Sequence, residues 1–274
     1  MRFKYEVQGR LFRNLGDGAR IVADDVELEQ HGSTTGDAFT DGWWFTARVN
    51  VDASNQAEAV QMAAAKVETL FHSVAIVGRG GPLAAAPFLE ESGGMEVKPQ
   101  DGPLQVHWPM PLLYDGVAIT PVMLAEMETK VQTVVNSSLK AGDNIKLALR
   151  WYAQAMKRYG AAHTNAEIDR FMHLWVAFDV LVPLGTGARS DPFDNFNGRA
   201  KKYLHHHYRD VKHKKVDAVL DRLYTIRKSI FHEGRHAANS HTERVRLLVR
   251  NLIFKELALP SLDPLPATFF DTHL

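Results

Sequence analysis

Arg227 and His232 are the residues of this chain whose types and spacing most suggest chemistry. In a helix with about 100° per residue, the apolar residues between Val216 and Ile230 share one face, and Arg227 falls near its centre. A guanidinium keeps its charge, so its burial is costly unless an anion or a hydrogen-bond acceptor meets it. The sequence therefore predicts that Arg227 either pairs with a carboxylate in the core or serves the function of the protein.

His232 follows Arg227 at the expected end of the same helix. Gly234 suits the left-handed position that commonly ends a helix, which places His232 on the final turn. If the helix is regular as far as His232, this side chain points about 140° away from Arg227 around the helix axis. The two groups then meet only if the helix end is distorted or if a second chain supplies one of them, and we favour the second chain.

Helical periodicity dominates the sequence around these residues, from residue 121 to residue 259. The spacing of apolar residues predicts helices over 122–139, 143–159, 164–182, 199–209, 216–231 and 240–257. A capping box formed by Ser240 and Glu243 is expected to begin the last of them. The helix that ends near Val182 is apolar on nearly all sides, which is typical of the centre of a bundle. Asp179 interrupts its surface and needs a partner.

The first hundred residues show strand patterns instead. Alternating apolar residues predict strands over 3–7, 21–28 and 43–51, and a capping box at Asn55 and Glu58 predicts a long amphipathic helix after them. A Gly- and Pro-rich stretch over 91–115 indicates a linker. We therefore expect an α+β protein, with an N-terminal α/β domain over 1–110, an all-α bundle over 111–260 and a tail over 261–274.

Composition excludes several classes of function. The 274 residues include no Cys, which rules out a disulfide framework, thiolate zinc sites and a Cys nucleophile. Lys and Arg number 32, as do Asp and Glu, so any contact with nucleic acid must come from a local patch. No apolar run is long enough for a membrane span, and the charged start does not suit a signal peptide. These features predict a cytoplasmic protein with no membrane partner.

A basic run before the Arg227 helix is the candidate patch. It contains Arg199, Lys201, Lys202 and Arg209, and Arg235 and His236 extend it after the helix. Such a run either follows a phosphate backbone or forms an ordinary solvated surface, and both interpretations stay open. His205, His206 and His207 lie in the same run, but adjacent histidines point to different sides of a helix. We therefore expect an exposed basic face here, with no metal site.

The helical half resembles a HEPN domain, and most closely its Apea-like branch. The resemblance is carried by the Arg227-to-His232 spacing, preceded by Leu-Tyr and followed by Glu-Gly. It is also carried by Asp179 in its apolar helix and by the stretch that starts at Arg150 and includes Trp151. It covers about residues 140–258 and leaves the first half unexplained.

The resemblance implies a metal-independent ribonuclease that works as a homodimer without a cofactor, in phage defence or as a toxin. His232 would be the general base on the ribose 2′-hydroxyl, because histidine titrates near neutrality. Arg227 would hold the scissile phosphate. Asp179, Lys228 and Glu233 would support them, although the family often has Asn where this chain has Lys228. The rival hypothesis is a non-catalytic interaction module in which Arg227 pairs with Asp179.

Overall fold

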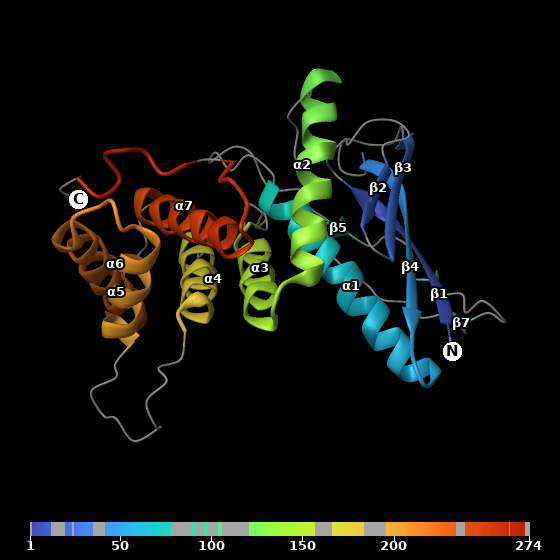
Figure 1. Cartoon of the computed structure of the whole chain (residues 1–274), viewed down its shortest axis with the longest axis horizontal. Coiled ribbons are helices and arrows are strands. Elements are labelled where there is room, and N and C mark those ends of the chain that lie inside the picture. Colours follow the sequence, from blue (N-terminus) through green and yellow to red (C-terminus); the bar gives the residue numbers. More distant parts are fainter. Residues whose placement is uncertain are drawn as a thin grey trace. The chain divides into compact units, whose positions relative to one another are not determined.

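The computed structural model describes residues 2–11, 20–23, 25–34, 42–77, 89–90, 96–97, 104–105, 121–156, 166–183, 196–233, 239–262 and 264–271. The chain divides into two compact units, with the main boundary between Ala141 and Gly142. All described strands belong to the first unit, and the regular elements described in the second unit are helices (Figure 1). The fold class is therefore α+β, as predicted.

The first unit is built on an antiparallel sheet with the strand order β2-β3-β4-β1-β5. Its strands are β1 (Arg2–Leu11), β2 (Arg20–Ala23), β3 (Val26–Thr34), β4 (Gly42–Asp52) and β5 (Leu89–Glu90). The short strands β6 (Glu96–Val97) and β7 (Leu104–Gln105) pair separately. Ala47 and Val49 of β4 are fully buried, and they lie opposite Leu28 and Val26 of β3. One face of the sheet is therefore apolar.

The predicted strand over 21–28 is wrong in one respect, because the structure has two strands there. β2 and β3 form a hairpin in which Ile21 lies opposite Leu28 and Ala23 lies opposite Val26. Asp25 lies in the turn, and its carbonyl oxygen accepts a hydrogen bond from the Asn50 amide at 2.8 Å. The turn contains neither Gly nor Pro, but the buried apolar residues shift from odd positions before Asp24 and Asp25 to even positions after them, and this shift marks the turn.

Helix α1 (Gln56–Val77) packs on β4 and β1, and the opposite face of the sheet carries charge. On that face Arg20 pairs with Glu27 at 2.6 Å, and Arg48 pairs with Glu29 at 2.9 Å. An antiparallel sheet with one covered face and one charged face is the α+β arrangement. The predicted N-terminal α/β domain is thus an antiparallel sheet with a helix on one face, as far as the structure describes it.

Helix α2 (Pro121–Lys140) belongs to the first unit, where it packs on α1 and β2. The Gln132 side chain accepts a hydrogen bond from the Val22 amide at 2.7 Å and donates one to the Val22 carbonyl oxygen. It thereby covers the outer edge of the sheet, where unpaired backbone groups would otherwise be exposed. The sequence had placed the boundary near residue 110 and this helix in the bundle. Most of the expected linker over 91–115 lies outside the described residues.

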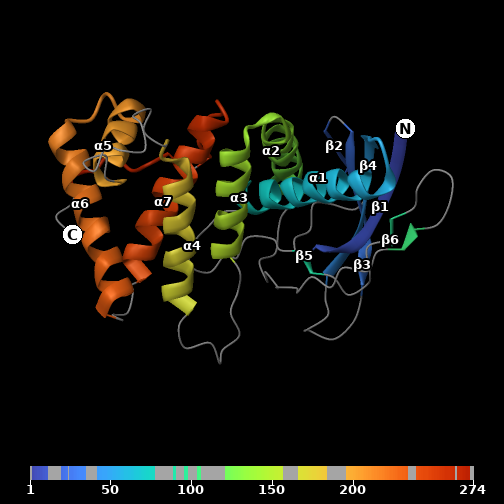
Figure 2. The same cartoon turned by 90° about the horizontal axis from the view of Figure 1, so that it is seen from below.

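The second unit contains five helices among the described residues (Figure 2). They are α3 (Asp143–Ala155), α4 (Ala166–Leu181), α5 (Phe196–His207), α6 (His213–Glu233) and α7 (Asn239–Glu256). Helix α4 contacts α3, α6 and α7, and Phe171, Leu174 and Phe178 are almost completely buried on it. This confirms the predicted central position of α4. Within the described ranges, every helix is too short or too polar to serve as a transmembrane span.

The described part of the predicted tail over 261–274 contacts this unit at a few residues near Phe270. Phe269 and Phe270 are 5% and 8% exposed, and the Phe269 carbonyl oxygen accepts a hydrogen bond from Arg244. Asp271 pairs with Lys215 at the start of α6. The two aromatic residues supply enough apolar area to hold the segment in place. The sequence pattern did not predict that Phe269 and Phe270 are buried, because most of the residues around them are polar or Pro.

Candidate functional site

Helix α6 positions both residues of the predicted motif. Its apolar stripe is buried as expected: Val216, Val219, Leu220, Leu223 and Ile230. The helix is continuous from His213 to Glu233, so its end is not distorted before His232. Arg227 and His232 therefore diverge by about 140° around the axis. Within one chain they do not face the same point.

Arg227 is half-buried, and it is held by aromatic rings rather than by a carboxylate. Its guanidinium carbon lies 4.3 Å from the centre of the Phe231 ring and 5.9 Å from that of Tyr224. These are cation–π distances. Nε of Arg227 is buried, and no described residue accepts a hydrogen bond from it. Two aromatic rings of the same helix therefore orient the guanidinium, and no described carboxylate forms an ion pair with it.

Asp179 is the carboxylate that the rival hypothesis pairs with Arg227. The described residues contain no ion pair between them within 4.0 Å, and the Asp179 side chain reaches solvent. The two groups still interact at longer range. Desolvation by the surrounding protein raises the pKa of Asp179, and the positive charges of Arg199 and Arg227 offset part of that rise. The structure therefore brings Asp179, Arg199 and Arg227 into one neighbourhood without closing an Asp179–Arg227 pair.

An aromatic cluster between α4, α5 and α6 fixes the Tyr224 ring that supports Arg227. Trp175 of α4 lies 6.2 Å from Tyr224 and 5.9 Å from Phe196 of α5, measured between ring centres. Phe196 stacks on Tyr224 at 6.4 Å, and Nζ of Lys228 lies 5.0 Å from the Tyr224 ring. Rings packed in this way leave few alternative rotamers. The sequence prediction missed this support, although the (i, i+3) and (i, i+4) spacing of Tyr224, Arg227 and Phe231 could have revealed part of it.

His232 lies on the final turn of α6, and its side chain is exposed. Among the described residues it has no hydrogen-bond or ion-pair partner. Glu233, proposed as a supporting residue, is the last residue of the helix and is exposed as well. Arg235 and His236 lie outside the described residues.

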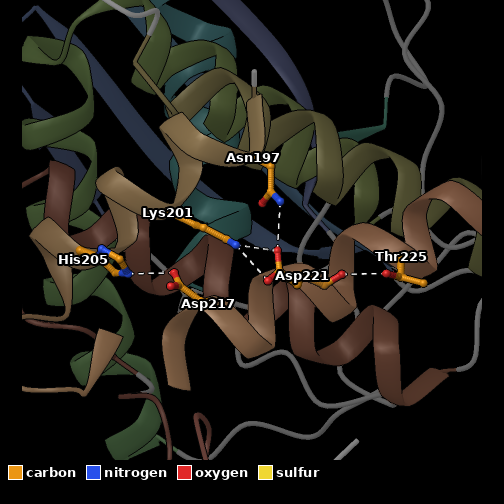
Figure 3. A network of polar contacts seen from close by, with 6 residues as sticks. All are labelled: Asn197, Lys201, His205, Asp217, Asp221 and Thr225. Atoms are coloured by element: carbon orange, nitrogen blue, oxygen red, sulfur yellow. Dashed lines mark hydrogen bonds and ion pairs between the residues drawn. The ribbon is translucent and has the colours of Figure 1, made fainter. Parts of the chain in front are cut away.

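The basic face of α5 is partly neutralised by acidic residues of α6 (Figure 3). Lys201 pairs with Asp221 at 2.8 Å, and Asn197 donates a hydrogen bond to the same carboxylate at 3.0 Å. Burial alone would raise the pKa of Asp221, but the hydrogen bonds from Lys201 and Asn197 lower it below its usual range. His205 contacts Asp217 at 2.9 Å. Lys201 is therefore already paired and is a poor candidate for a phosphate contact.

The other predicted basic residues of this region differ in their surroundings. Arg199 donates a hydrogen bond to the Pro183 carbonyl oxygen at 2.9 Å. Arg209 contacts the backbone and ring of His206 three residues earlier, at 3.2 and 3.0 Å. Lys202 is exposed, and no described residue pairs with it. The run is therefore not one uninterrupted positive surface.

The three adjacent histidines contact three different partners. His205 stacks on His213 with 3.8 Å between ring centres, and His206 meets Arg209. His207 shares the carboxylate of Glu256 with another residue of its own helix. No group of three potential metal ligands occurs within the described parts of the chain. His205 and His207 are half-buried, so the expectation of a fully exposed histidine face is wrong for these two.

Glu256 at the end of α7 offers a test of pH dependence. It accepts hydrogen bonds from the Tyr203 hydroxyl at 2.7 Å and from His207 at 3.0 Å. The bond from His207 lowers the pKa of Glu256 below 4.5, burial opposes this, and the bond from Tyr203 adds to it. A lowered pKa in the folded state stabilises the fold above the ordinary range of Glu, and the gain is lost as pH falls through the folded pKa.

We expect Glu256→Gln to lower the free energy of unfolding by about 1 kcal/mol at pH 7, because two hydrogen bonds to a charged acceptor are weakened. The difference from the wild type should shrink as pH falls below the ordinary pKa of Glu. Urea denaturation at pH 7 and at acidic pH measures the loss of stability and its dependence on pH. Asp210→Asn, at an exposed carboxylate in the turn after α5, is the control and should change neither value. If the difference in the free energy of unfolding does not depend on pH, the charge of Glu256 does not stabilise the fold.

Two further arginines, which the sequence prediction did not identify, are more deeply buried than Arg227. Arg246 is 4% exposed and Arg250 is 1% exposed, both on α7. The guanidinium of Arg246 binds both carboxylate oxygens of Glu243, at 2.6 and 2.7 Å, and also donates to the Tyr152 hydroxyl at 3.3 Å. Such satisfied groups hold helices together. Arg227 differs from Arg246 because no residue that the structure describes provides such an acceptor for it.

Comparison of the chain with protein-family models, with curated proteins and with solved structures finds no match. The candidate site therefore rests on its residues and their geometry.

Proposed function

We propose that this protein is a metal-independent endoribonuclease, or an RNA-binding protein, of the HEPN type. The observation that carries the proposal is the state of Arg227: its guanidinium is oriented on Phe231 and Tyr224, yet no described carboxylate neutralises it. A fixed cation with which no described residue forms an ion pair is suited to bind a phosphate. The similarity of the Arg227-to-His232 segment to the family adds support, and so does the nearby Asp179.

In the proposed reaction, His232 removes the proton from a ribose 2′-hydroxyl. The 2′-oxygen then attacks the adjacent phosphorus, and the bond from phosphorus to the 5′-oxygen of the next nucleotide breaks. The leaving oxygen takes up a proton, which gives a 2′,3′-cyclic phosphate and a 5′-hydroxyl. Arg227 binds the phosphate and stabilises the negative charge that develops on it. Lys228 is exposed one residue further along and adds a second positive charge near the same phosphate.

The site requires two chains in this proposal. Because α6 is regular through Glu233, Arg227 and His232 of one chain point in different directions. A two-fold axis near the end of α6 would place Arg227 of one protomer opposite His232 of its partner. Such a homodimer would contain two equivalent sites. Of the basic residues predicted to contact RNA, Lys202 within α5 and Arg209 in the turn after it are exposed, and they could contact RNA outside the site.

The test is incubation of the purified protein with a mixed RNA substrate in the presence of EDTA. We expect cleavage to persist, and its products to carry 2′,3′-cyclic phosphate ends. Light scattering of the same sample should give the mass of a dimer. Cleavage that EDTA abolishes and added metal restores would reject the proposed chemistry. A monomer at tens of micromolar would reject the shared site. A dimer that neither binds nor cuts RNA would favour the non-catalytic interaction module.

A further inference from the structure

Phe231 is unusually exposed for a residue next to the core. Its exposed fraction is 41%, whereas the preceding residue, Ile230, is 6% exposed. Burial of a phenylalanine side chain is favourable by roughly 1.5–3 kcal/mol, so an exposed ring forgoes much of that stabilisation. Leu147 on α3 is the other large hydrophobic residue exposed to this extent in the described part of the second unit. Phe231 differs from it because a cation lies on the ring.

Aromatic and cationic side chains alternate along this end of α6. Tyr224 is followed one turn later by Arg227 and Lys228, and one turn later again by Phe231. The guanidinium of Arg227 lies over the Phe231 ring at 4.3 Å, and the ammonium of Lys228 lies over Tyr224 at 5.0 Å. Surfaces that bind single-stranded nucleic acid combine these two groups, because cations bind the backbone and aromatic rings stack on the bases.

We propose that Phe231 stacks on an unpaired base of the RNA, next to the phosphate that Arg227 holds. This inference rests on the proposed function and adds a positioning residue to it. Within a nucleotide the base and the phosphate are joined through one ribose, and Phe231 and Arg227 are in direct contact. A ligand that binds the cation therefore brings a base within reach of the exposed part of the ring. The ring would select substrates whose base is free to leave a helical stack.

The alternative hypothesis is that the exposed Phe231 contacts a second protein chain. The charges favour the nucleotide, because the guanidinium of Arg227 lies on the ring and Lys228 lies three residues before Phe231 on the same helix. Desolvating these two cations in an apolar protein contact would be unfavourable without acidic partners. A nucleotide supplies the negative charge and the aromatic face together.

The test uses full-length protein with His232→Ala, so that bound RNA is not cut. Affinity is measured by fluorescence anisotropy for a single-stranded oligonucleotide, for a duplex of the same sequence and for an oligonucleotide with abasic positions. Phe231→Leu should weaken binding to the single strand by about tenfold, because the stacked base is lost. Phe231→Trp should retain the affinity, because it keeps a ring for both Arg227 and the base. Phe231→Leu should weaken binding to the abasic strand clearly less than binding to the single strand, because only the contact between the ring and Arg227 is lost there. Leu147→Ala is the matched control and should have no effect.

If Phe231→Leu leaves the affinity for the single strand unchanged, the inference about Phe231 is wrong, but the proposed function still stands. A Phe231→Leu protein that loses its dimeric mass and equally loses affinity for the abasic strand would assign Phe231 to the chain–chain contact instead. Protein that binds no RNA in any form would overturn the proposed function together with this inference.

Discussion

Replacing His232 by alanine is expected to abolish RNA cleavage and to leave thermal stability nearly unchanged. His232 is exposed on the last turn of α6 and has no partner among the described residues, so its removal breaks no internal contact. As the general base it would contribute about 10²- to 10⁴-fold to the rate. Cleavage assays and thermal melts on the same preparation measure both effects. Persistent cleavage by His232→Ala would exclude this residue as the base.

Arg227→Ala belongs to the same experiment and should also abolish cleavage. Its effect on stability separates the two hypotheses for Arg227. A buried Arg227–Asp179 pair broken on one side would cost about 3–5 kcal/mol. The structure shows cation–π contacts of Arg227 and, in the part of the chain that it describes, no ion pair with Asp179, so we expect a loss of about 1 kcal/mol. Lys214→Ala, at an exposed basic residue of the same helix, is the control and should affect neither activity nor stability.

The largest loss of stability is expected at Glu243, on the α7 helix. Glu243→Ala removes both carboxylate oxygens from Arg246, whose side chain is only 5% exposed. A buried guanidinium without its acceptor is strongly destabilising, and we expect a loss of about 3 kcal/mol in the free energy of unfolding. We expect a value in the lower part of the range for a broken buried ion pair, because the Glu243 side chain is 34% exposed and the pair is only partly shielded from water. Urea denaturation at neutral pH measures the loss.

The Glu167–Arg170 pair on α4 is a matched control. It has the same spacing of three residues and an N–O distance of 2.5 Å, but Arg170 is 25% exposed. Water can therefore solvate Arg170 after the substitution, and Glu167→Ala should cost about 1 kcal/mol or less. Equal losses at the two sites would show that burial of the arginine does not govern the effect.

The sequence pattern predicted the regular elements well, because each depends on residues close together in the chain. The helix over 216–231 and the strand over 43–51 were recovered as α6 and β4 with small changes at their ends. The predicted capping box at Asn55 was found in part: the Glu58 amide donates to Asn55, while the Glu58 carboxylate accepts from Ser54. The box predicted at Ser240 was not found in that form, because Glu243 binds Arg246 with both oxygens.

Contacts between elements could not be read from the sequence. The spacing within α5 suggested an open basic face, but Asp217 and Asp221 of α6 lie opposite its His205 and Lys201. Such pairings depend on how two helices face each other, and spacing within one helix does not specify this. The same limit explains why the sequence placed helix α2 in the bundle, whereas the structure groups it with the first unit. The contact of Phe231 with Arg227 also required the structure.

The central claim is that Arg227 of one chain and His232 of its partner form a single site. It is tested most directly by mixing two inactive variants, Arg227→Ala and His232→Ala, under conditions that exchange subunits. Random pairing makes half of the dimers mixed, and each mixed dimer has one complete site of two, so about a quarter of the wild-type cleavage should return. Each variant alone should stay inactive. A mixture that contains mixed dimers and still fails to cleave RNA would contradict the shared site.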